Sequence, residues 1–72
     1  MKTIHTEEYK VILRKLIGAR KKSGLTQVEL ARKLGKPQSF ISKIENGERR
    51  LDIIELKQIA KLYKVNVKNL LI

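Results

Sequence analysis

The stretch that decides the fold is TQVELARKLGKPQSFISKIENG, residues 26–47. Thr26, followed three residues later by Glu29, forms a capping box that marks the start of a helix. Apolar residues then recur with the helical period on one side of that helix: Leu30, Ala31 and Leu34. Gly35 ends this helix in a tight turn, and Pro37 cannot continue a helix but can open the next one. The stretch therefore predicts a helix, a glycine turn and a second helix.

The second of these helices is expected to span about residues 38–45, and its two sides differ in chemistry. Ile41 and Ile44 form a narrow apolar side that faces inward. The opposite side carries polar residues and one lysine: Gln38, Ser39, Ser42 and Lys43. Such a side suits the major groove of DNA, where base edges offer hydrogen-bond donors and acceptors rather than charges. Asn46-Gly47 closes the helix, because glycine readily takes the left-handed conformation that a helix end needs.

At this point the sequence resembles a known family. The combined pattern TQxxLAxxLG followed by SxISKxENGxR is similar to the Cro/phage-repressor, or Xre-like, helix-turn-helix family. The resemblance extends over about residues 12–71, with the helix-turn-helix itself at 26–45. It implies a compact bundle of about five helices, similar to the lambda-repressor DNA-binding domain, that binds operator DNA as a dimer.

The resemblance also implies roles for single residues. Base contacts are expected from the outer side of the second helix of the motif: Gln38, Ser39, Ser42 and Lys43. Phosphate contacts are expected from Gln27, Asn46, Arg49 and Arg50. Arg20 and Glu45 match a partly buried ion pair that ties the first helix to the third. The sequence departs from the family pattern at Ile17, Phe40 and Leu51, where polar residues or a proline are frequent.

The flanking segments also predict helices. Thr6 can cap a helix over about residues 6–22, and Gly24 can stop it. A second capping box, formed by Asp52 and Glu55, starts a fourth helix, and a short fifth helix is expected from Asn66 onward. The predicted fold class is all-α, with residues 1–72 forming a single domain.

Composition limits the possible functions. The chain has 72 residues, no cysteine and one histidine, His5, so we expect no disulfide, no metal site and no cofactor. Neither a phosphate-binding loop nor a Ser/His/Asp set can be assembled, so we expect no enzyme activity. We also expect no small-molecule ligand, because a domain of this size leaves no room for a ligand pocket. The formal net charge of +10 indicates a polyanionic partner, and an acidic membrane surface is the competing interpretation. No membrane-spanning run or signal peptide is evident, which predicts a cytoplasmic protein without a membrane partner.

Dimerisation is the expected source of additional stability, because a core this small is marginal. The candidate interface consists of aliphatic residues around the last two helices: Ile53, Ile54, Val67, Leu70, Leu71 and Ile72. The alternative is that Leu70 and one isoleucine complete the core of the monomer while the other residues lie at a frayed terminus.

The leading hypothesis is a dimeric repressor or controller protein that binds double-stranded operator DNA of two-fold symmetry. An antitoxin-type module, whose main partner is a toxin protein, is the alternative from another class. A third hypothesis is a binder of nucleic acids or membranes that depends on charge alone. Charge-only binding predicts equal affinity for operator and random DNA.

Overall fold

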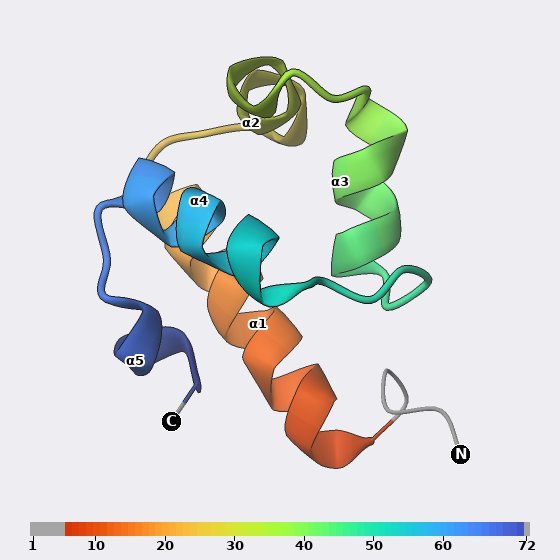
Figure 1. Ribbon diagram of the computed structural model, residues 1–72, viewed down its shortest axis with the longest axis vertical. Helices are drawn as coiled ribbons and strands as arrows, with labels where there is room; N and C mark the ends of the chain where they lie inside the picture. The colour runs from red at the N-terminus through yellow and green to blue at the C-terminus, as the bar shows by residue number, and fades with distance from the viewer. Residues whose placement is uncertain (1–5, 72) are drawn as a thin grey trace.

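The computed structural model describes residues 6–71, and within this range the chain forms five α-helices and no strand (Figure 1). The helices are α1 (Glu7–Lys22), α2 (Gln27–Leu34), α3 (Gln38–Glu45), α4 (Ile53–Tyr63) and α5 (Val67–Leu71). The predicted all-α fold is therefore confirmed. The expectations for His5 and Ile72 lie outside the described residues.

Side-chain caps start three of these helices where the sequence predicts them. Thr6 accepts a hydrogen bond from the Tyr9 N–H at the start of α1. The Thr26 hydroxyl accepts from the Glu29 N–H at 3.1 Å, and the Glu29 carboxylate accepts from the Thr26 N–H at 2.9 Å. Asp52 and Glu55 form the same reciprocal pair at the start of α4. These bonds satisfy N–H groups that a helix start otherwise leaves without partners.

The turn between α2 and α3 requires glycine. Gly35 ends α2 in the left-handed conformation, with φ of 69°. The next residue, Lys36, then donates its N–H to the Ala31 carbonyl at 2.9 Å, which closes the helix end. Pro37 leads directly into α3 from an extended conformation, and its side chain offers no capping bond.

All five helices contribute to the core. Its buried apolar members are Leu13, Leu16, Leu30, Ala31, Ile41, Ile44, Leu56, Ile59, Ala60, Tyr63 and Leu70. The elements in contact include α2 with α3, and α1 with both α3 and α5. In Figure 1, α3 and α5 lie on opposite sides of the long α1 helix. The recognition candidate α3 is thus held against the bundle by one side only.

The expectation that Leu70 belongs to an exposed dimer surface is corrected by this core. Leu70 is 3% exposed and packs inside the monomer, because α5 folds back against α1 and α4. Val67 is half-buried against the same core. Ile53, Ile54 and Leu71 are the members of the predicted patch that are exposed.

Two glycines provide a matched test of these backbone conformations. We expect Gly35→Ala to lower the free energy of unfolding by about 1–2 kcal/mol, because an L-residue is strained at positive φ. We expect Gly18→Ala to raise it by about 0.5–1 kcal/mol, because Gly18 lies inside α1 and a Cβ there meets nothing within 4 Å. Urea unfolding of both variants measures the two effects. Destabilisation of equal size in both would contradict the assignment.

Candidate nucleic-acid interface

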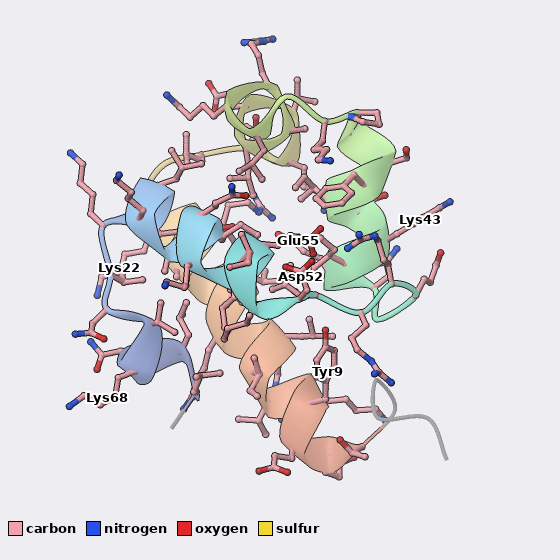
Figure 2. All side chains as sticks on the ribbon, in the orientation of Figure 1. Tyr9, Lys22, Lys43, Asp52, Glu55 and Lys68 are labelled. Atoms are coloured by element: carbon pink, nitrogen blue, oxygen red, sulfur yellow. The ribbon has the colours of Figure 1, made fainter. Side chains whose placement is uncertain are left out.

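The outer side of α3 is exposed because the opposite side of the helix is buried in the core. Ile41 and Ile44 are 1% and 3% exposed, and they fix the rotation of the helix about its axis. This rotation leaves Gln38, Ser39 and Lys43 exposed and Ser42 half-buried. In Figure 2 the labelled Lys43 side chain extends away from the rest of the molecule. The predicted base-contacting residues thus share one accessible side of α3.

A buried ion pair holds the end of α3 to α1. Arg20 Nε donates to Glu45 Oε2 at 2.7 Å and Arg20 Nη2 donates to Glu45 Oε1 at 3.1 Å, so the pair is bidentate. A third bond runs from Arg20 Nη1 to the Leu25 carbonyl oxygen at 2.9 Å. The side chains of Arg20 and Glu45 are only 10% and 7% exposed. The hydrogen bond to Glu45 raises the pKa of Arg20 further above its ordinary value.

Glu45 extends this network to the start of α3. Gln27 Nε2 donates to Glu45 Oε1 at 2.9 Å, and Gln38 Nε2 donates to Gln27 Oε1 at 3.2 Å. The expected phosphate contact, Gln27, is therefore engaged by protein groups on both sides of its amide. Gln38 uses one amide N–H in this chain, and a primary amide has a second N–H and a carbonyl oxygen. The network orients the Gln38 side chain before any ligand arrives.

Arg49 also makes contacts within the chain that the sequence did not predict. Its Nη1 and Nη2 atoms donate to the two carboxylate oxygens of Glu55, each at 3.0 Å. Its guanidinium carbon lies 4.5 Å from the centre of the Phe40 ring, and the Lys36 ammonium lies 5.2 Å from the same ring. These contacts make Arg49 a link between α3 and α4. Its side chain is still 40% exposed, and the expected phosphate contact stays a prediction.

This link shifts the pKa of both its charged ends. The hydrogen bond to Glu55 raises the pKa of Arg49. Chiefly the same bond, helped by the N–H of Asp52, lowers the pKa of Glu55. Glu55 thus serves the cap of α4 and the Arg49 link at once.

The other expected phosphate contacts lie in the loop after α3. Asn46 and Arg50 are exposed there, and Asn46 follows the last residue of α3 directly. A bond that sequence patterns did not predict fixes the far end of the loop, where the Leu51 N–H donates to the Tyr9 hydroxyl at 3.1 Å. The 42-residue separation of these partners leaves no local signal.

The positive charge of the chain lies mainly outside the helix-turn-helix. Residues 29–55 hold six Lys or Arg against five acidic residues, whereas residues 9–28 and 56–72 hold ten Lys or Arg and no acidic residue. An acidic membrane surface is the competing partner for this positive charge. Among residues 6–71, no helix is long and apolar enough to cross a membrane.

Comparison with known proteins identifies the family. A family model described as helix-turn-helix matches residues 16–70, which is most of the chain. This chain belongs to the Xre-like helix-turn-helix family. The fold is also similar to that of an XRE-family like protein from Pseudomonas syringae pv. tomato str. DC3000, with a TM-score of 0.86 and 48% sequence identity over 97% of this chain and 85% of that one. A search of curated proteins found no match. Family membership supports a DNA-binding regulator, in agreement with the leading hypothesis from the sequence.

The Arg20–Glu45 pair gives a stability prediction for this member of the family. We expect Glu45→Ala to lower the free energy of unfolding by about 3–5 kcal/mol, because it leaves Arg20 buried without its carboxylate. Thermal unfolding measures the change. Glu48→Ala is the matched control, since Glu48 is exposed three residues away, and it should melt close to the parent. Similar melting temperatures for both variants would contradict the importance of the pair.

The lowered pKa of Glu55 gives a pH prediction. Its folded-state pKa lies below the ordinary value of 4.5, so its stabilising effect is complete above pH 4.5 and is lost as the pH falls through the folded-state value. We expect Glu55→Gln to reduce the loss of stability on acidification below pH 4.5. Urea unfolding of parent and variant across that range tests this, and identical pH slopes would refute it.

Proposed function

We propose that this chain is a sequence-specific transcriptional regulator that binds operator DNA as a homodimer, with α3 in the major groove. The observation that carries the proposal is the outer side of α3, where Gln38, Ser39 and Lys43 are exposed together. Bidentate contact of a glutamine to adenine and donation from a lysine to guanine are established ways to distinguish base pairs. Ser39 and Ser42 add hydroxyl groups that suit either base type.

The backbone contacts are assigned to residues at the ends of the motif. Asn46 and Arg50 follow α3 and are proposed to contact phosphates. Gln27 is the first residue of α2. We propose that its side-chain amide contacts a phosphate and at the same time keeps its hydrogen bond to Glu45. Such contacts fix the register of a protein on DNA and carry no sequence information. Arg49 is proposed to contact a phosphate as well, through the exposed part of a side chain that also holds Phe40 and the loop in place.

A homodimer is proposed because one α3 contacts only a few base pairs. Two copies related by a two-fold axis place their recognition helices about 34 Å apart, on one side of the duplex. Ile53 and Ile54 support this proposal, since they are 60% and 59% exposed, next to each other at the start of α4. Leu71 is 48% exposed at the end of α5. The proposed role is that of a repressor, which would occupy an operator that overlaps a promoter.

The direct test is a selection of bound fragments from a pool of random double-stranded DNA. The proposal predicts that a palindromic or nearly palindromic sequence is enriched over successive rounds. Retention of all sequences to the same extent would instead indicate binding through charge alone, and would refute the proposal.

Variants of α3 test the base contacts. With the selected operator, we expect Gln38→Ala and Lys43→Ala each to lose about 1–3 kcal/mol of binding free energy and to relax the preference at one base pair. Fluorescence anisotropy with single-substitution operators measures both effects. Arg50→Ala is the contrasting variant, because loss of a phosphate contact should weaken operator and random DNA by the same factor. Unchanged base preference in both α3 variants would contradict the assignment.

The dimer is tested by sedimentation. We expect the parent chain to sediment as a dimer at micromolar concentration, and the double variant Ile53→Glu/Ile54→Glu as a monomer, because carboxylates cannot be buried in an apolar interface without a large penalty. Val28→Glu is the matched control on α2, since Val28 is 45% exposed but lies outside the proposed patch. A monomeric parent that binds single half-sites as tightly as palindromes would refute the dimer.

A further inference from the structure

A groove unrelated to the outer side of α3 lies between the second half of α1 and the α4–α5 connection. Its floor is largely apolar and is formed by Gly18, Ala19, Val65 and Leu70. Three lysines line its edges: Lys15, Lys22 and Lys64. In Figure 2, Lys22 and Lys68 lie on the opposite side of the molecule from Lys43. The groove is therefore accessible while α3 is occupied.

Charge is distributed around this groove without any compensation from acidic residues. The segments that form it belong to residues 9–28 and 56–72, which contain no Asp or Glu. Residues 29–55, which include α3, the loop after it and most of α2, are in contrast nearly balanced in charge. The groove thus presents a local positive field of its own.

Gly18 is a second feature of the groove, and packing within the chain does not explain why this residue is glycine. Glycine weakens a helix interior, yet a Cβ at position 18 meets nothing within 4 Å among the described residues. The small residue is therefore not required by close packing inside the fold. It keeps the floor of the groove open, beside Ala19, so that a side chain from outside can approach the backbone of α1.

We propose that this groove binds an acidic peptide segment of a partner protein, with an apolar side chain of the segment seated against Gly18 and Ala19 and carboxylates near Lys15, Lys22 and Lys64. An apolar floor between lysines suits an amphipathic acidic segment, because a nucleic acid backbone has no protruding apolar side chain that could fill it. A second copy of this chain fits poorly. Its own groove-forming segments are purely basic, and four of its seven acidic residues, Glu29, Glu45, Asp52 and Glu55, are engaged in caps or ion pairs. The exposed acidic residues are Glu7, which pairs with Lys10, Glu8 and Glu48, and they do not form one continuous segment.

Because the groove is separate from α3, a partner protein can bind there while the chain is bound to DNA. A peptide in the groove and a duplex on α3 occupy different sides of the bundle, so both can be bound together. The proposal does not depend on the operator function, because peptide binding is measured without DNA.

The test uses the full chain and a short synthetic peptide of alternating leucine and glutamate. We expect saturable binding by fluorescence anisotropy, with shifts of the backbone amide NMR signals of Gly18, Ala19 and Val65. A glutamate–serine peptide and a leucine–lysine peptide should both bind at least about tenfold more weakly. The first lacks the apolar side chains, and the second lacks the carboxylates. Equal binding of the glutamate–serine peptide, or shifts confined to α3, would overturn the proposal.

Two kinds of variant separate charge from shape. Lys15→Glu/Lys22→Glu should weaken the leucine–glutamate peptide about tenfold or more, whereas Arg32→Glu/Lys57→Glu, with the same charge change at exposed sites outside the groove, should not. Gly18→Leu should abolish binding without a change of charge, and leucine favours the helix, so the variant remains folded. Full affinity in either groove variant would refute the assignment.

Excess random-sequence duplex DNA is the final arm. We expect the peptide to remain bound, because α3 and the groove lie on different sides of α1. Displacement of the peptide by the duplex would identify the groove as a nucleic acid surface and overturn the proposal.

Discussion

The structure depends most on one carboxylate, that of Glu45. It binds Arg20 through two hydrogen bonds and accepts a third from Gln27. Through Arg20 it also reaches the Leu25 carbonyl in the connection before α2. A charge that is nearly removed from water is tolerated only when such partners surround it. The same contacts set the positions of the end of α1, the start of α2 and the end of α3, so the geometry of the recognition helix follows from satisfying one buried charge.

A second constraint is the division of charge within the chain. Residues 29–55, which include α3 and most of α2, are nearly balanced in charge, while α1, α4 and α5 supply most of the lysines. A side of α3 with few charges can discriminate bases through hydrogen bonds, because unspecific attraction to phosphates does not dominate at the contact itself. The remote lysines raise the local concentration of polyanions over a longer range. Specific contact and general attraction are thus assigned to different parts of one small bundle.

Sequence patterns predicted what depends on neighbouring residues. The capping boxes at Thr26 and Asp52, the turn at Gly35 and the two sides of α3 follow from local chemistry and helical period. The Arg20–Glu45 pair followed from the family resemblance rather than from spacing. The contacts of Arg49 with the Phe40 ring and with Glu55 were not predicted. Glu55 already had a role as a helix cap, and no local pattern links Arg49 to Phe40. The burial of Leu70 was also not predicted, since it depends on α5 folding back against α1. The groove depends on the same fold-back and has no counterpart in any linear pattern.

The hydrogen bond between Gln38 and Gln27 has a consequence for how this scaffold can acquire new operator preferences. Ser39 and Lys43 project from a helix whose packing rests on Ile41 and Ile44, so other polar residues can replace them without disturbing the core. Gln38 is tied instead to Gln27, which is tied to Glu45. A new residue at position 38 therefore also alters the surroundings of the buried pair. Redesign of base preference is simplest at positions 39 and 43, while position 38 has to change together with position 27.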